Sequence, residues 1–153
     1  SAAKYIATTI MEVNLDAKVY DTPMVCVIEV MGRNAGWVAL EAGIATGASA
    51  IVINEVEFDE DKVIAQVLEA KKNNKRNFIV CIAEGVPAVV GDKLYSEKFA
   101  KRFEEKTGIE TKFVRLAHIV RGGSPTLRDR LVDFLMEKKL LKYCVQREFS
   151  CHM

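Results

Sequence analysis

Short apolar segments alternate along this chain with longer segments of mixed polarity. The apolar segments are rich in β-branched residues and show no polar alternation, which is typical of strands buried on both faces. The mixed segments carry apolar residues at the spacing of amphipathic helices. The pattern predicts strands at residues 25–30, 51–53, 78–82 and 111–116, and helices at residues 2–13, 37–45, 59–73, 95–106 and 126 to about 143.

Turn-forming residues separate these predicted elements. Gly47 and Gly108 directly follow two of the helical segments, where a helix often ends on a glycine. Residues 14–23 are predicted to be a polar connection that closes in an Asp21-Thr22-Pro23 turn before the first strand. Residues 86–93 lack a clear period and are predicted to form a loop.

The alternation of strands and helices indicates the fold class. Strand–helix–strand units favour a parallel sheet, because the returning helix packs against a face of the sheet. We therefore predict an α/β fold, with a doubly wound, mostly parallel sheet flanked by helices in a three-layer sandwich. Residues 1–143 are predicted to form a single domain, followed by a tail at residues 144–153.

Composition narrows the class of protein further. The chain has 153 residues, of which 50% are apolar, and a net charge of +1, so we expect neither a nucleic-acid nor a membrane partner. Its four cysteines show no metal-ligand spacing and no disulfide framework, which favours a cytoplasmic location. The chain opens at Ser1 directly into a predicted helix, and we expect it to be a fragment or a processed piece.

Polar side chains follow each of the four predicted strands. Arg33 follows the first, Asn54 and Glu55 the second, Glu84 the third, and His118 and Arg121 the fourth. Parallel strands point the same way, so these side chains should meet at the edge where open α/β sheets bind ligands.

The types of residue at this edge indicate the ligand. Two arginines and a histidine, with glycines beside both arginines, suit a phosphate. Glu84 accepts hydrogen bonds when it is ionised, which suits sugar hydroxyls. The residues alone therefore predict a site for a sugar phosphate or a related phospho-ligand.

Each of these residues also has a purely structural interpretation. Glu84 could cap a helix or pair with a lysine, and His118 could be a structural histidine. Glu55 is expected to do nothing chemical, because it precedes a solvated helix start. Ser124 and Pro125 could simply begin the last helix, as N-cap and first helical residue.

Three motifs taken together resemble the phosphofructokinases. They are Glu29-Val30-Met31-Gly32-Arg33, Glu84-Gly85, and His118-Ile119-Val120-Arg121-Gly122-Gly123-Ser124-Pro125 with Asp129-Arg130. They occur in the family's order and spacing, and the likeness runs from about Ser1 to Arg130. It corresponds to the sugar-phosphate half of the family's subunit.

The resemblance implies a role for each matching residue. Met31, Gly32 and Arg33 would bind fructose 6-phosphate, and Arg33 would also act in catalysis by stabilising charge on the transferred phosphoryl group. Glu84 would bind sugar hydroxyls, and His118 and Arg121 would bind the 6-phosphate and its surroundings.

The resemblance also implies an oligomer, because the family has two arginines that reach into a neighbouring subunit's site. Met24 stands at one of these positions. Lys112 stands at the other, where it keeps the charge but loses the planar fork of an arginine. Lys112 is therefore included among the expected substrate-binding residues of a homo-oligomer.

The family's glycine-rich nucleotide loop and its aspartate-rich catalytic segment do not occur in this sequence. Phosphoryl transfer needs a donor, a metal and a base. We therefore expect the parent enzyme of glycolysis to use Mg2+ with ATP or pyrophosphate, while this chain alone holds no metal and no cofactor and is inactive. A non-catalytic sugar-phosphate-binding module, or a structural assembly domain, remains an alternative.

Overall fold

The computed structural model describes residues 2–17, 22–73 and 75–150. Side chains are described for these residues except residues 16, 17, 122 and 140–150. Asp21 of the predicted turn, the side chain of Cys144 and the last three residues of the predicted tail therefore lie outside the description. The chain forms two compact units, Ala2–Gly122 and the segment that begins at Gly123.

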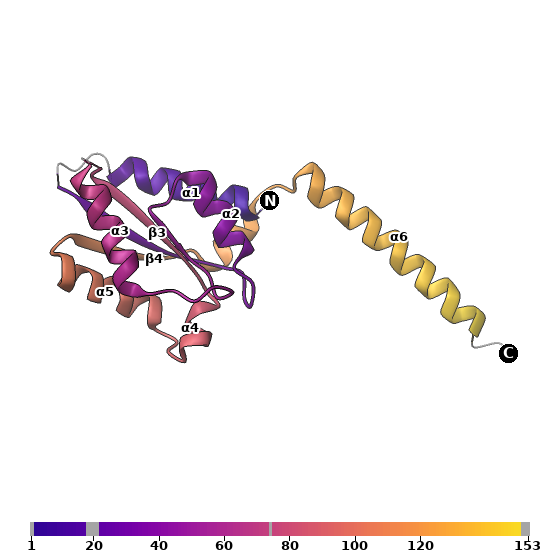
Figure 1. The fold of residues 1–153 in the computed structure, drawn as a ribbon. Coiled ribbons are helices and arrows are strands. Elements are labelled where there is room, and N and C mark those ends of the chain that lie inside the picture. Colours follow the sequence, from indigo (N-terminus) through magenta and orange to yellow (C-terminus); the bar gives the residue numbers. More distant parts are fainter. Residues whose placement is uncertain (1, 18–21, 74, 151–153) are drawn as a thin grey trace. The chain divides into compact units, whose positions relative to one another are not determined.

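The first unit is built on a parallel sheet of four strands (Figure 1). These are β1 (Met24–Val30), β2 (Ala50–Val52), β3 (Asn77–Ala83) and β4 (Glu110–Arg115). Their spatial order is β2-β3-β1-β4, and every neighbouring pair is parallel. The predicted fold class is confirmed.

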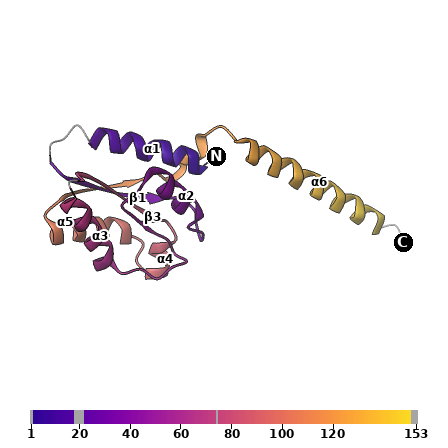
Figure 2. The same ribbon diagram turned by 45° about the horizontal axis from the view of Figure 1, so that its top comes forward.

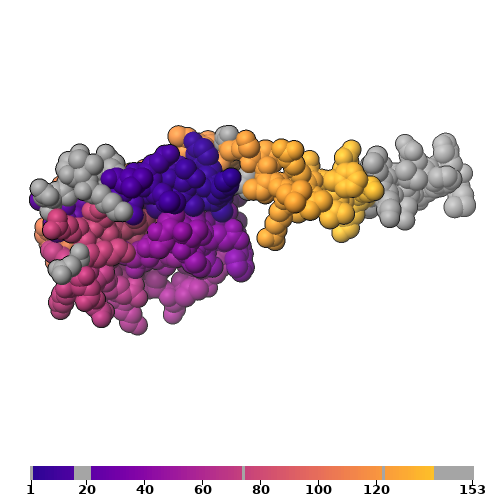
Figure 3. All heavy atoms as spheres, turned by 90° about the horizontal axis from the view of Figure 1, so that it is seen from above, coloured from indigo at the N-terminus to yellow at the C-terminus, as the bar shows by residue number. Residues whose placement is uncertain are grey.

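Helices cover both faces of the sheet, as Figure 2 shows. On one face, α1 (Ala2–Ala17) and α2 (Trp37–Thr46) pack side by side (Figure 3). On the other face, α3 (Glu60–Lys72) packs against α5 (Tyr95–Thr107). The chain moves across the sheet in one direction from β1 to β2, and in the opposite direction from β2 to β3 and on to β4. Because the crossovers have the same handedness, α2 lies on one face of the sheet, and α3 and α5 lie on the other.

The core is the sandwich between the sheet and these helices. All seven residues of β1 are buried, as expected for a central strand covered on both faces. Phe99 and Phe103 of α5 and Phe78 of β3 are the largest of the fully buried side chains. This rigid layer fixes the carboxyl ends of the strands, where the loops of interest begin.

Two predicted connections are wrong. Residues 86–93 are not a loop throughout, because Val86–Val90 form the short helix α4 and only residues 91–93 remain outside a regular element. Its three valines are weak helix formers, but Pro87 at its start and Gly91 just after its end are the residues that favour helix boundaries. The polar connection is shorter than predicted, because α1 continues through Asn14 to Ala17.

The last two elements follow β4. The 3-10 helix η1 (Ala117–Gly122) closes the first unit, and α6 (Leu127–Ser150) makes up most of the second. Thr126 caps α6 in place of the predicted Ser124: its hydroxyl donates to Asp129 Oδ2 at 2.7 Å and accepts from the Asp129 backbone N–H at 3.3 Å. The helix also extends beyond the predicted end near Tyr143. Within the described residues, no helix has both the length and the apolar character needed to cross a membrane.

Candidate functional site

The loop that follows β1 carries Arg33 at the carboxyl edge of the sheet. Residues 32–35 form a turn in which the Ala35 N–H donates to the Gly32 carbonyl at 3.0 Å. A Cβ atom at Gly32 would lie 2.3 Å from the Ala35 carbonyl oxygen, so this turn requires a glycine there. Arg33 itself has a φ of 54°, in the left-handed region that side chains disfavour.

Glu84 brings the end of β3 to the same turn. The backbone N–H of Arg33 donates to Glu84 Oε1. The Glu84 N–H in turn donates to the Val30 carbonyl at 2.9 Å, which continues the ladder between β1 and β3 by one residue. The carboxylate of Glu84 is thus directed at the Arg33 turn, rather than at a helix end or a lysine.

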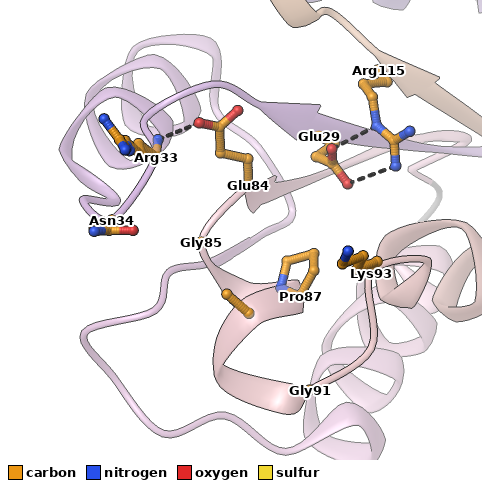
Figure 4. Close-up of a pocket in the computed structure, with 10 residues that line it drawn as sticks. Glu29, Arg33, Asn34, Glu84, Gly85, Pro87, Gly91, Lys93 and Arg115 are labelled. Atoms are coloured by element: carbon orange, nitrogen blue, oxygen red, sulfur yellow. Dashed lines mark hydrogen bonds and ion pairs between the residues drawn. The ribbon is translucent and has the colours of Figure 1, made fainter.

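A cleft of about 550 Å³ opens beside these two residues. Figure 4 shows Arg33 and Glu84 at one end of it and Arg115 and Lys93 at the other. Three cationic and two anionic side chains therefore line one cleft. Such a set suits a ligand that carries both an anionic group and hydroxyl groups. The lining residues are Glu29, Arg33, Asn34, Glu84, Gly85, Pro87, Ala88, Gly91, Lys93 and Arg115.

Glu29 and Arg115, which both line this cleft, form an ion pair. Arg115 Nε donates to Glu29 Oε1 at 2.6 Å, and Nη2 approaches Oε2 at 3.4 Å. The hydrogen bond with Glu29 raises the pKa of the Arg115 guanidinium. Sequence reasoning did not assign Arg115 to the site, because a single arginine at the end of a strand gives no such signal. The register, which sets Arg115 opposite Glu29 on β4 and β1, is the feature that identifies it.

His118 and Arg121 lie on η1 rather than in the cleft. Buried Leu116 and Val120 anchor this 3-10 helix to the core, and His118 is exposed. Arg121 Nε approaches Met31 Sδ at 3.5 Å, so the structure brings Arg121 and Met31 together at the start of the Arg33 loop. Neither His118 nor Arg121 is among the described residues that line the cleft.

Lys112 lies away from the other predicted residues. It sits in the middle of β4, in register with Cys26, and is 3.6 Å from Glu110. It lies three positions before Arg115 along the strand, which is roughly 10 Å of strand rise. Within the chain as described, no group of three or more histidine, cysteine, aspartate or glutamate residues is placed to hold a metal ion.

The chain is thus a parallel α/β domain with a cleft of mixed charge at the carboxyl edge of its sheet. Comparison with known proteins identifies it further. The sequence model of the family described as "Phosphofructokinase" matches residues 1–144. The chain belongs to the phosphofructokinase family, which confirms the resemblance.

Individual relatives agree with this assignment. The chain is 43% identical, over 126 residues, to "ATP-dependent 6-phosphofructokinase 1" of Clostridium perfringens, and 42% identical to an "ATP-dependent 6-phosphofructokinase" of Clostridium botulinum. In each case the match covers 82% of this chain and 37% of the relative. The chain thus spans little more than a third of the length of these relatives.

Solved structures show the same fold. Phosphofructokinase from Saccharomyces cerevisiae superposes with a TM-score of 0.77 at 33% identity, over 88% of this chain and 18% of that one. Pyrophosphate-dependent phosphofructokinase from Nitrosospira multiformis gives a TM-score of 0.78 at 26% identity, over 95% and 39%.

Proposed function

We propose that this chain is the fructose 6-phosphate-binding part of a 6-phosphofructokinase. That enzyme is a phosphotransferase of glycolysis, and it transfers a phosphoryl group to the 1-hydroxyl of fructose 6-phosphate. The names of the relatives support the proposal. The observation that carries it is the hydrogen bond from the Arg33 backbone to Glu84, which joins the two main motif residues beside a cleft of suitable charge.

The residues divide the work of binding and catalysis. Arg33, Met31 and Gly32 bind the sugar phosphate from the loop after β1, and the Arg33 guanidinium stabilises the charge that develops on the transferred phosphoryl group. Glu84 accepts hydrogen bonds from sugar hydroxyls through the carboxylate oxygen that the Arg33 N–H leaves available. Arg121 and His118 bind the phosphate from η1. Lys112 serves a neighbouring subunit of a homo-oligomer.

The phosphoryl donor and the metal belong to other parts of the enzyme. Among the described residues, no group of three or more histidine, cysteine, aspartate or glutamate side chains is placed to hold a metal ion. The donor is ATP or pyrophosphate, since relatives of both kinds share this fold. The isolated chain is accordingly a cytoplasmic sugar-phosphate-binding unit without turnover. A non-catalytic sugar-phosphate-binding module is the alternative.

Calorimetric titration of the full chain with fructose 6-phosphate tests the proposal. Arg33→Ala removes a charged hydrogen-bond donor, and Arg128→Ala on α6 is a charge-matched control. Loss of such a partner should weaken binding roughly 10- to 100-fold. Fructose and inorganic phosphate, titrated separately, show whether both halves of the ligand are recognised. Equal heats for the wild type and Arg33→Ala, or no heat at all, would contradict a complete site within this chain.

A further inference from the structure

The turn that carries Arg33 needs external support. Arg33 occupies a left-handed backbone conformation, and its side chain is exposed, so its own packing does not hold it there. Its N–H must nevertheless point at Glu84 for the two residues to act together. Two further hydrogen bonds reach the same loop, and both come from the carboxyl end of β2.

Asn54 supplies the first of these bonds. Its side-chain Nδ2 donates to the Asn34 carbonyl at 2.8 Å, immediately after Arg33. This orientation of the amide is the one that pairs a donor with that carbonyl; the reversed orientation would oppose two acceptors. Asn54 thus holds the second half of the turn.

Glu55 supplies the second bond. Its Oε1 accepts from the Gly36 N–H at 2.7 Å, at the point where the loop ends and α2 begins. A Cβ atom at Gly36 would lie 2.6 Å from Glu55 Oε2 and 2.5 Å from Ile53 Cβ, so only glycine lets β2 approach the loop this closely. A carboxylate at the N-terminus of α2 is also electrostatically favourable.

The buried amide of Asn54 is energetically unfavourable on one side. Its Oδ1 is buried and has no hydrogen-bond partner among the described residues. It faces Gly85, where an added Cβ would lie 2.8 Å from it. A buried acceptor without a partner needs a reason, and the bond from the other end of the same amide to Asn34 supplies one.

We propose that Asn54 and Glu55 are positioning residues, which hold the Arg33 turn so that its N–H meets Glu84. Neither residue lines the cleft, so both act through Arg33 rather than on a ligand. The consequence for ligand binding rests on the proposed function. The consequence for the turn itself does not.

Amide hydrogen exchange of the full chain, without ligand, tests the effect on the turn. Asn54→Asp keeps the size of the side chain but turns an acceptor toward the Asn34 carbonyl, and Glu55→Ala removes the acceptor for Gly36. Both should raise the exchange rate of the Arg33 amide at least about five-fold, since each loses one hydrogen bond. Glu55→Gln retains an oxygen at this position and should restore protection. An unchanged Arg33 amide in both variants would overturn the proposal.

Titration with fructose 6-phosphate tests the effect on binding. Asn54→Asp and Glu55→Ala should weaken binding by about five-fold, whereas Glu55→Gln and the exposed control Glu57→Ala should bind as the wild type does. Unchanged binding by a variant whose Arg33 amide has lost protection would overturn the positioning role. If the wild type itself gives no heat, the proposed function fails, and the exchange experiment alone decides whether Asn54 and Glu55 hold the turn.

Discussion

Glu29 is a carboxylate on a central, fully covered strand, with a relative exposure of only 7%. Burial of a charge is costly unless a partner compensates it. Arg115 compensates it from the edge strand through both nitrogens of its fork, while its own side chain remains 44% exposed. The pair therefore holds the end of β4 against β1, directly before η1.

The substitution Arg115→Ala should destabilise the folded chain. Glu29 would remain buried without its partner, so we expect the free energy of unfolding to fall by roughly 2–3 kcal/mol, less than for a fully buried pair because Arg115 is partly solvated. Urea unfolding of the full chain measures this change. Lys101→Ala, which removes the exposed pair with Glu97, should cost under about 0.5 kcal/mol. An equal loss of unfolding free energy in the two variants would show that the Glu29–Arg115 pair contributes no more than an exposed ion pair.

At the scale of elements, the helices α3 and α5 are joined by a small polar cluster. The Tyr95 hydroxyl donates to Glu60 Oε1 at 2.7 Å, and Arg102 donates to both oxygens of the same carboxylate, at 2.5 and 3.2 Å. Partial burial alone would raise the pKa of Glu60, but the hydrogen bonds from Arg102 and Tyr95 outweigh it and lower the pKa. Burial and the bond to Glu60 raise the pKa of Tyr95.

This cluster predicts a defined pH dependence. Because the pKa of Glu60 is lower in the folded chain than the value of 4.5 expected without these contacts, its contribution to stability is full above that pH and is lost as the pH falls through the folded value. Glu60→Gln should therefore be less stable than the wild type at pH 7, by up to about 1 kcal/mol after allowing for solvent screening.

Urea midpoints between pH 7 and pH 3 measure this difference, which should shrink toward the acid end. Glu97→Gln serves as the control, because its pair with Lys101 is exposed and should contribute little at any pH. A difference between Glu60→Gln and the wild type that stays constant with pH would contradict the assignment.

The elements also show which features a sequence can predict. β1, α2, α3 and α5 were predicted because long apolar runs or a clear helical period define them locally. α4 was missed because three valines in five residues give no helical period, and its formation depends on Pro87 and Gly91 at its ends and on burial of Val86. The 3-10 helix η1 was not predicted either.

The candidate site divides in the same way. The motifs and the strand ends predicted Arg33 and Glu84, and the structure brings them together. Glu29–Arg115 and the supporting bonds of Asn54 and Glu55 depend on strand order and register, which local patterns do not encode. Glu55 is expected to do nothing chemical because it precedes a solvated helix start, and the hydrogen bond that it accepts from the Gly36 N–H is a structural contact that local patterns do not reveal.

At the scale of the whole molecule, the two described cysteines lie deep in the sheet of the first unit. Cys26 of β1 and Cys81 of β3 are 3% and 0% exposed. Burial raises the pKa of Cys26 to about 11 and that of Cys81 to about 12, although Lys112 slightly opposes the shift at Cys26. Both thiols are therefore protonated and inaccessible in the folded chain.

Thiol labelling should consequently report opening of the sheet. The experiment uses a background with Cys144→Ser and Cys151→Ser, at a pH about one unit below the pKa of a free thiol. Under these conditions a thiol reagent should modify the folded chain far more slowly than the chain unfolded in urea. The labelling rate should follow the stability of variants such as Arg115→Ala, because only opened molecules react. Labelling at the rate of a free thiol in native buffer would show that the sheet is not closed.

The last prediction concerns catalysis. On the proposed function, this chain supplies charge stabilisation and sugar binding while the donor site lies elsewhere in the enzyme, so the isolated chain should show no turnover with fructose 6-phosphate, Mg2+ and either ATP or pyrophosphate. The Clostridium perfringens relative offers the missing context, since this chain matches 37% of its length. Replacing the matched segment of that enzyme with the corresponding part of this chain should give an active chimera.

On the proposed function, Arg33→Ala in that chimera should lower kcat far more than it raises KM, because the guanidinium would act on the charge of the transferred group. Arg128→Ala, outside the first unit, should leave both parameters unchanged if the matched segment includes it. Turnover by the isolated chain would show that it holds a donor site of its own. An inactive but folded chimera, or an active one that tolerates Arg33→Ala, would show that this edge of the sheet serves assembly rather than phosphoryl transfer.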